Sequence, residues 1–354
     1  MADKIDPAHA ETEEILKKLE SRIKKEYQQA TKEMEAKIDD YMERFKLKDQ
    51  KWREWVADGT KTDAQYKMWR QQQMMVGKSY EALKDTLADE MVNADKIAKA
   101  MTLNTMPDVY ATNFNYGTFE AEKGAKLDTS FTLYDRNAVN RLLKEDPDFI
   151  PPMGRQAKKD IAEGKVKAWN KQQVQSVMTQ GILQGESIPQ LSKRLANTVG
   201  ERNYKSAIRN ARTMTTGVQN AGRMDSYRRA ESLGIDMEVE WRATLDNRTR
   251  HEHRQLDGQK RPVGEPFEVH GIEIEYAGDP HAPANMIYNC RCTLNGIVKG
   301  YEPRARKYRD DSMIDGMSYD QWKAQKKSKS NPITLQEEKG KAIAEKYKKE
   351  YRKK

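Results

Sequence analysis

Residues 235–243, Ile-Asp-Met-Glu-Val-Glu-Trp-Arg-Ala, alternate apolar and charged side chains without interruption. A period of two places every apolar side chain on one face of a β-strand. Two shorter runs with the same period, 267–269 and 272–274, are joined by His270-Gly271, which predicts a hairpin with a short turn. The alternation over 290–294 predicts a further strand. We therefore expect a small antiparallel sheet towards the C-terminal end.

The N-terminal half has the period of an α-helix instead. From Glu14 to Phe45 the apolar residues recur at intervals of three and four, which predicts one long helix with a narrow stripe like a coiled-coil seam. Asp58-Gly59 marks a turn, and a second long helix is predicted over 63–101. The stripe of the first helix consists of Leu16, Leu19, Ile23, Tyr27, Ala30, Met34, Ile38, Tyr41 and Phe45.

The sequence pattern changes in the middle of the chain. Asn113, Asn115, Tyr116 and Gly117 suggest an irregular or hairpin segment, and prolines after residue 146 mark a boundary. Further helices are predicted over 135–144, 158–180, 187–195 (with Ser187 as N-cap) and 203–233.

The expected fold class is α+β, a helical layer combined with a small antiparallel sheet. We expect four parts along the chain: a charged helical arm over 1–101, an irregular connector over 102–157, an α+β domain over 158–300, and a basic helical or disordered tail over 301–354.

The composition limits what this chain can be. Of 354 residues, 34% are charged and only 36% belong to the hydrophobic set, too few for one compact globule of this length. A membrane span is not expected, because no run of about 18 apolar residues occurs. The N-terminal sequence lacks the layout of a signal peptide, and two cysteines cannot form a disulfide framework, so we expect a reducing compartment.

The basic excess lies at the C-terminal end. Residues 323–354 contain twelve Lys or Arg and four Asp or Glu, a net charge of +8, while the rest of the chain is nearly neutral. Such a tail attracts DNA without sequence preference, or it is merely a solvated end. The candidate DNA-binding residues are Lys348, Lys349, Arg352, Lys353 and Lys354.

Metal-ligating residue types gather between residues 251 and 292. Four of the five histidines and both cysteines lie there, and Cys290 and Cys292 share one face if the segment is a strand. Thiolates and imidazoles are the ligands of structural zinc sites. We expect no cofactor, and the alternative is a zinc ion at His253, Cys290 and Cys292. The other interpretation is a pair of buried thiols beside a hydrogen-bonded histidine.

Catalysis is not expected. His, Glu and Asp in this region could serve a metal-dependent nuclease or an acyl transferase. However, the sequence contains no P-loop, no Gly-x-Ser-x-Gly and no His-Glu-x-x-His motif.

Several motifs together resemble the phage Mu F-type head morphogenesis domain of minor head proteins from tailed phages, particularly phages of Gram-positive hosts. The likeness covers about residues 160–300. It rests on Ala211-Arg212-Thr213 through Asn220, Gly222-Arg223 and Tyr227, then Trp241-x-Ala243-x-x-Asp246-x-Arg248, His253-x-x-Leu256-Asp257-Gly258, and Asn289-Cys290-Arg291-Cys292.

The resemblance implies a structural motif made of Asp246, Arg248, His253, Asp257, Gly258, Asn289, Cys290, Arg291 and Cys292. Some members of the family carry Cys-x-x-Cys where this chain has Arg250 and His253, which suggests a metal site there. In this chain only His253 could serve as a ligand. Some relatives continue into toxin or transferase domains, but we expect no appended enzyme here.

The resemblance also implies a minor capsid component of the virion, inside the head near the portal vertex, present in the host cytoplasm during assembly. Such a protein assists procapsid assembly or DNA packaging and delivery. Its implied partners are the portal protein, scaffold or major capsid protein, and non-specific DNA. The alternatives are a DNA-binding or DNA-processing protein, and a transient scaffold-like coiled-coil assembly factor.

Two structural expectations follow. The arm, residues 10–100, should dock on portal or scaffold through Leu16, Ile23, Met34 and Ile38, because its stripe is too narrow for an independent globule; deleting it should leave a folded C-terminal domain. In that domain Asp246 and Arg248 should pair and fix the loop up to Asp257-Gly258 against the strand of Cys290 and Cys292, and His253 should face the thiols.

Overall fold

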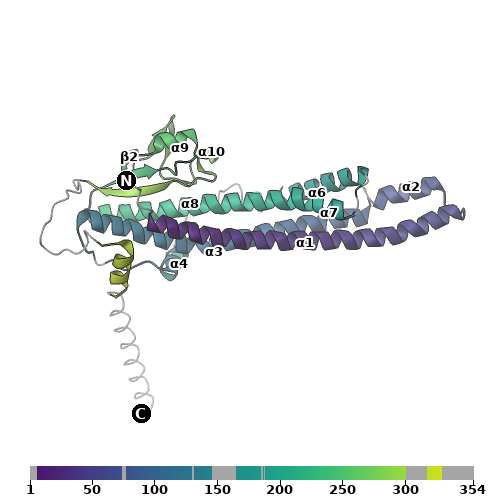
Figure 1. Cartoon of the computed structure of the whole chain (residues 1–354), viewed down its shortest axis with the longest axis horizontal. Coiled ribbons are helices and arrows are strands. Elements are labelled where there is room, and N and C mark those ends of the chain that lie inside the picture. Colours follow the sequence, from purple (N-terminus) through teal and green to yellow (C-terminus); the bar gives the residue numbers. More distant parts are fainter. Residues whose placement is uncertain are drawn as a thin grey trace, which may run out of the picture. The chain divides into compact units, whose positions relative to one another are not determined.

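The structure, a computed structural model, describes residues 6–73, 77–129, 131–145, 165–184, 186, 188–299 and 317–328. Three long helices dominate it: α1 (Pro7–Ala57), α3 (Lys78–Ala125) and α8 (Glu201–Ser232) (Figure 1). The other helices are α2 (Asp63–Gln71), α4 (Arg136–Glu145), α6 (Lys165–Leu183), α7 (Ile188–Leu195), the π-helical turn η2 (Ala196–Gly200), α9 (His251–Leu256), α10 (Ala284–Ile287) and residues 319–328.

The strands all lie in the last third of the chain. They are β1 (Met237–Arg242), β2 (Lys260–Pro262), β3 (Phe267–Val269), β4 (Ile272–Ile274) and β5 (Thr293–Val298). All the pairings are antiparallel, in a three-stranded sheet of order β2-β1-β5 and a β3-β4 hairpin. The α+β class is therefore confirmed, with long N-terminal helices and a small sheet.

The chain divides into two compact units. Unit 1 contains the described residues of 1–15, 106–151 and 213–354, and unit 2 those of 16–105 and 152–212. The helices α1, α3 and α8 each contribute to both.

Unit 2 is a helical bundle whose centre is the predicted stripe of α1. Within this unit α1, α3 and α8 run alongside one another: the hydroxyl of Tyr27 bonds to the carboxylate of Asp95, and its ring meets that of Tyr204 edge-on at 6.0 Å. Eight of the nine residues of the stripe are buried, from Leu16 to Tyr41, and only Phe45 is partly exposed. The predicted stripe is confirmed.

The expected docking seam is wrong, however. Leu16, Ile23, Met34 and Ile38 expose 8%, 0%, 2% and 0% of their surface, so the chain's own helices already cover them. A partner cannot bind these side chains without opening the bundle.

The prediction of an irregular segment from residue 102 onwards is also wrong for residues 102–125, which are helical. The second long helix, expected over 63–101, is instead two helices: α2 ends before Gly77, whose amide bonds to the carbonyl of Gln72, and α3 then continues through Pro107 to Ala125. Residues 146–164, the N-cap residue Ser187 and the DNA-binding candidates 348–354 lie outside the described residues.

Close helix packing explains the misleading residues of α3. A Cβ on Gly117 would lie 1.9 Å from the hydroxyl oxygen of Ser226 on α8. A Cβ on Gly222 of α8 would lie 2.8 Å from the carbonyl oxygen of Tyr110 on α3. Gly222 therefore lets the backbones of α3 and α8 approach each other, and Gly117 makes room for the side chain of Ser226 against α3; neither glycine marks a turn.

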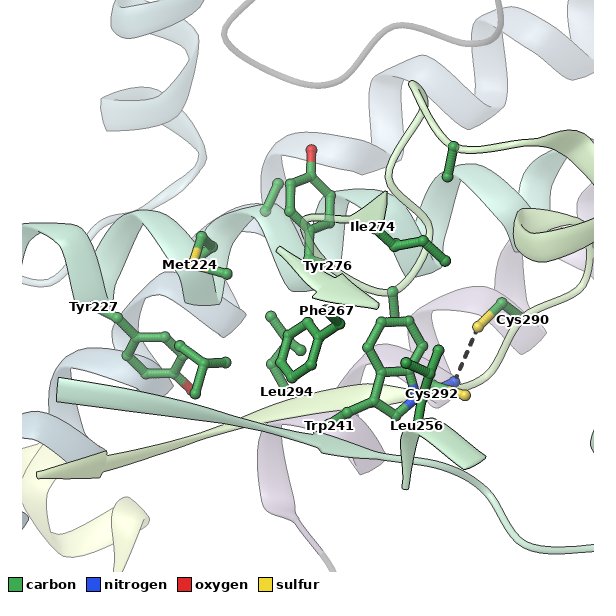
Figure 2. Close-up of a cluster of buried hydrophobic side chains, with 14 of the residues drawn as sticks. Met224, Tyr227, Trp241, Leu256, Phe267, Ile274, Tyr276, Cys290, Cys292 and Leu294 are labelled. Atoms are coloured by element: carbon green, nitrogen blue, oxygen red, sulfur yellow. Dashed lines mark hydrogen bonds between the residues drawn. The ribbon is translucent and has the colours of Figure 1, made fainter. Parts of the chain in front are cut away.

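The core of unit 1 lies between the sheet and α8. Figure 2 shows Met224 and Tyr227 of α8 beside Phe267 and the strand residues Trp241 and Leu294. All five side chains are at least 99% buried. The hairpin turns at His270-Gly271, both with positive φ (50° and 73°), as the sequence predicts. The cysteines differ from expectation: they precede β5 and do not belong to the strand.

A helical segment near the C-terminal end completes unit 1. In residues 319–328 the indole of Trp322 donates to Glu122 at 2.7 Å, and the buried ammonium of Lys326 binds Glu122 at 2.8 Å and Asp128 at 2.9 Å. Lys326 thus belongs to the fold, although it was counted in the basic tail.

Among the helices that the structure describes, none has the length and apolar character needed to cross a bilayer.

Replacing Gly222 by Ala should destabilise the protein. Alanine normally favours a helix interior over glycine by about 1 kcal/mol, but here the added Cβ meets the backbone of α3, and overpacking costs about 1–3 kcal/mol. We expect denaturant unfolding to show a net loss of about 1 kcal/mol for Gly222→Ala and more for Gly222→Val. A gain in stability for Gly222→Ala would contradict this close contact.

Candidate functional site

The candidate site is built on one polar face of α8. Thr213, Thr216, Asn220 and Arg223 are spaced by three or four residues, so they lie along one side of the helix. All four bond to the segment 289–294, which carries the Asn-Cys-Arg-Cys motif. Side chains of the helix therefore satisfy backbone groups that sheet pairing leaves free.

Asn220 is the centre of this face. Its amide nitrogen donates to the carbonyls of Thr216 (3.0 Å), Ala277 (2.9 Å) and Cys292 (3.0 Å), and its oxygen accepts from the amide of Leu294 at 3.0 Å. Thr216 adds a bond of 2.6 Å to the carbonyl of Cys290. Both residues are buried, so each contact is protected from water.

Arg223 lies on the same face and is 99% buried. Its guanidinium donates to the carbonyl of Leu294 at 2.7 Å and to Asn113 Oδ1 at 3.0 Å, pairs with Asp6, and stacks over Tyr116 at 4.8 Å. A buried charge is tolerated only when it is paired and hydrogen-bonded in this way.

The buried contact of Thr12 contradicts the expectation that residues 10–100 form a separable arm, and Asp6, which precedes those residues, also belongs to unit 1. Asp6 binds Arg223 with one carboxylate oxygen, and with the other it caps α1 by accepting from the amides of Ala8 and His9, both at 3.0 Å. The hydroxyl of Thr12 accepts from Asn113 at 2.8 Å. Deleting the arm would therefore remove part of the core of unit 1.

An Asp–Arg pair fixes the loop after β1, but the main partner of Asp246 is Arg291 and not the expected Arg248. The carboxylate of Asp246 accepts two bonds from Arg291, both 2.8 Å long, and one from the amide of Arg248 at 2.9 Å. These bonds, from Arg291 first, hold the pKa of Asp246 well below its usual range. The side chain of Arg248 is largely exposed, 3.3 Å from Asp246.

Asp257-Gly258 closes the same loop against β1. The carboxylate of Asp257 accepts from the amide of Ala243 at 2.8 Å, and the amide of Gly258 donates to the carbonyl of Trp241 at 2.8 Å. Gly258 has φ +77°, which favours glycine, and Asn289 adopts φ +54° at the corner before the cysteines.

His253 faces both thiols. Its Nδ1 lies 3.2 Å from Cys292 Sγ and 3.5 Å from Cys290 Sγ, and all three side chains are at least 97% buried. The dashed line in Figure 2 marks the amide of Cys292 bonding to Cys290 Sγ at 3.4 Å. Both cysteines are free.

The two sulfurs have opposite acidities. The hydrogen bond from Cys290 first, and then the hydrogen bond with His253, lower the pKa of the Cys292 thiol. The same bond to Cys292, together with burial, raises the pKa of Cys290. Of the two thiols, Cys292 therefore loses its proton more readily.

The structure brings together Asp246 with Arg291, and His253 with Cys290 and Cys292. Three other histidines lie apart from the thiols: His251 stacks on His270 at 6.4 Å, and His281 contacts Asp279 at 3.1 Å. Asn220 and Arg223 belong to the motifs that carry the family resemblance, but neither they nor Thr216 are predicted as site residues from the sequence. The sequence does offer a signal for these residues: they are polar, and they repeat every three or four positions along a helix, so they share one face.

Comparison with known proteins assigns part of this sequence to a family. Residues 172–295 match the family model described as Phage Mu protein F like protein. Residues 172–295 are a Mu F-like head morphogenesis domain. The resemblance noted from the sequence motifs is thereby confirmed.

Two curated relatives are similar to this chain. The minor head protein GP7 of Bacillus phage SPP1 is 34% identical over 160 residues, covering 43% of this chain and 50% of the relative. The NAD(+)–arginine ADP-ribosyltransferase EFV of Enterococcus faecalis is 30% identical over 255 residues, covering 68% of this chain and 50% of the relative. The chain thus spans about half the length of these relatives. No solved structure matches.

The Mu F-like domain contains every motif residue from Asn220 to Cys292. It does not contain all the partners of the buried charge of Arg223. Asp6, Asn113 and Tyr116, which surround Arg223, precede residue 172 in the sequence. The physical unit is therefore larger than the matched domain.

Replacing Asp246 by Asn should lower the melting temperature of the Mu F-like domain at pH 7, because Arg291 loses its charged partner. A carboxylate whose pKa is depressed by folding stabilises above its unfolded pKa, about 3.9, and this stabilisation is lost as the pH falls towards the folded value. The difference between wild type and variant should therefore be constant from pH 7 to about pH 5 and shrink at lower pH.

The matched control is Asp236→Asn, which removes an ion pair between the 67%-exposed Asp236 side chain and Lys299. Thermal melts of this variant should coincide with those of the wild type. If Asp246→Asn also melts with the wild type at pH 7, the loop does not depend on this pair.

Proposed function

We propose that this chain is a head morphogenesis protein, a minor component of a tailed-phage virion that assists procapsid assembly and DNA packaging or delivery. The observation that carries the proposal is the Mu F-like domain itself, whose motif residues form one bonded network around α8. The printed name of the SPP1 relative, minor head protein, supports it.

We propose the portal protein as the main partner, with the protein inside the head near the portal vertex; scaffold and major capsid protein are further candidates. Since the seam of α1 is covered, the contact must use another surface. The best candidate is the aromatic tip, which we define as Phe45, Trp52, Trp55, Tyr66 and Trp69 on α1 and α2.

The aromatic tip is unusual because it is stacked but not buried. The rings of Trp52 and Trp69 stack at 5.3 Å, Phe45 stacks on Trp69 at 5.6 Å, and Trp55 meets Trp52 edge-on. No residue of α2, which is described along its whole length, is buried. Exposed tryptophans are typical centres of protein interfaces.

Trp55→Ala should weaken association with co-expressed portal protein. Trp55 is 39% exposed, and truncating an interface tryptophan typically costs 2 kcal/mol or more, roughly a 30-fold loss of affinity. Trp169→Ala on α6 is the matched control, because Trp169 is equally exposed at 39% but lies outside the tip. Pull-down and titration with purified portal measure the effect.

Equal binding by wild type and Trp55→Ala would contradict docking through the tip. An inventory of purified particles separates the remaining alternatives. A protein present in procapsids but lost from mature virions would be a transient scaffold-like factor.

We also propose that the basic tail binds DNA without sequence preference, through Lys348, Lys349, Arg352, Lys353 and Lys354. Lys326 serves the fold, so the informative truncation is after Ser328; it removes nine basic and four acidic residues.

Truncation after Ser328 should weaken DNA binding and flatten its salt dependence, since each lost phosphate contact reduces the slope by about 0.9. Replacing the five candidate residues by Gln in the full chain should give the same change without shortening it. Titrations of duplex DNA at several salt concentrations provide the measurement. An unchanged slope would leave the tail as a solvated end.

We propose, finally, that the chain acts without catalysis. The name of the Enterococcus faecalis relative describes an arginine ADP-ribosyltransferase, but this chain spans only half of that protein. Transfer of label from NAD⁺ to arginine by the purified chain would contradict the proposal, as would metal-dependent cleavage of duplex DNA.

A further inference from the structure

Three ligand atoms converge in a buried place that the head-assembly function does not use. His253 comes from α9, while Cys290 and Cys292 lie on the segment between α10 and β5. Their ligand atoms all lie within 4.8 Å of one another, and all three residues are at least 97% buried.

The spacing fits one tetrahedral metal ion. With Zn–S bonds of about 2.3 Å and Zn–N bonds of about 2.05 Å, tetrahedral angles place a nitrogen and a sulfur about 3.6 Å apart, and two sulfurs about 3.8 Å apart. The observed nitrogen–sulfur distances are 3.2 and 3.5 Å. Both nitrogen–sulfur distances are therefore within a few tenths of an ångström of those in a zinc site, and the two sulfurs lie within 4.8 Å of each other.

The orientation of the histidine supports the same conclusion. Its Nδ1 points at both sulfurs, while its buried Nε2 has no hydrogen-bond partner within the described chain. With its proton on Nε2, the imidazole directs the Nδ1 lone pair at the two thiols. This is the tautomer that a metal requires.

The donor set selects the kind of ion. Two thiolates and one imidazole are soft to borderline ligands, which suit zinc and not the oxygen-seeking magnesium or calcium. Two thiolates also neutralise a divalent cation, so the loaded site carries no net charge into the interior.

We propose that His253, Cys290 and Cys292 bind one Zn²⁺ ion, with water in the fourth position, and that the ion fastens α9 to the Asn-Cys-Arg-Cys segment. On binding, each thiol releases its proton to solvent and the imidazole keeps its proton on Nε2. Thr216 and Asn220 of α8 bond to the carbonyls of Cys290 and Cys292, while His253 of α9 contacts a sulfur of the same segment. The ion would therefore connect α9 to a segment that α8 holds through its backbone.

Elemental analysis of the full chain, produced without a histidine tag, tests the proposal. We expect about one zinc per chain, because the three residues form a single site. After removal of the metal by a chelator, titration with Co²⁺ should produce the intense thiolate-to-cobalt absorption, saturating at about one equivalent. Added Zn²⁺ should abolish that band by displacing the cobalt.

Single variants identify the ligands. Cys290→Ser, Cys292→Ser and His253→Asn should each lose the zinc and most of the cobalt band. His251→Asn is the matched control, since it changes the exposed histidine two residues earlier on α9 and should retain both signals.

Thiol reactivity is measured on the unaltered chain, so this test does not require any variant to fold. In the unaltered chain, a thiol reagent should modify both cysteines at least 10-fold faster after chelation than with zinc bound. Folded protein that contains no zinc, gives no cobalt–thiolate band and shows the same thiol reactivity with and without added Zn²⁺ would overturn the proposal. The three groups would then be a hydrogen-bonded cluster only.

Discussion

The structure of unit 1 depends on one requirement: the polar backbone of residues 289–294 must be satisfied inside a small core. Strand β5 pairs with β1 along one edge, but the carbonyls of Cys290 and Cys292 lie outside that ladder. Asn220 and Thr216 supply their hydrogen bonds from α8, and an unmade bond there would cost about 1–3 kcal/mol. The helix therefore acts as the missing neighbour of the segment.

This requirement explains why a polar helix face can be buried. Asn220 uses both ends of its amide on backbone groups, and Arg223 joins a backbone carbonyl to Asn113 and Asp6. Satisfied polar networks of this kind tie down one arrangement, because any slip leaves a buried charge or amide unpaired. The small apolar content of the chain is compatible with a unique fold for this reason.

Much of this fold could be predicted from the sequence, because much of it is periodic. The alternation over 235–243 gave β1, the positive-φ pair His270-Gly271 gave the hairpin, and the three-and-four stripe gave the buried face of α1. Local signals of this sort need no knowledge of the partner surface.

The errors arose where a residue's role depends on distant contacts. Gly117 and Asn113 suggest a turn by local propensity, but in the structure one permits a close helix crossing and the other binds Arg223 and Thr12. The expectation that His253 faces the thiols agrees with the structure, but the distances depend on how α9 folds back, which no spacing in the sequence determines. Propensity is overridden where tertiary packing supplies the compensating bonds.

The boundaries of the Mu F-like domain do not coincide with those of the folded unit. The match begins within α6 and ends within β5, and inside it lies every residue that bonds to the Asn-Cys-Arg-Cys segment from α8. Yet the charge of Arg223 is balanced by Asp6, at the start of α1, which is more than two hundred positions away in the sequence. The same α1 continues into unit 2, where α1 and α2 carry the aromatic tip. Because Asp6 balances the buried charge of Arg223, the first turn of α1 and its N-terminal cap belong to the folded unit that contains the Mu F-like domain.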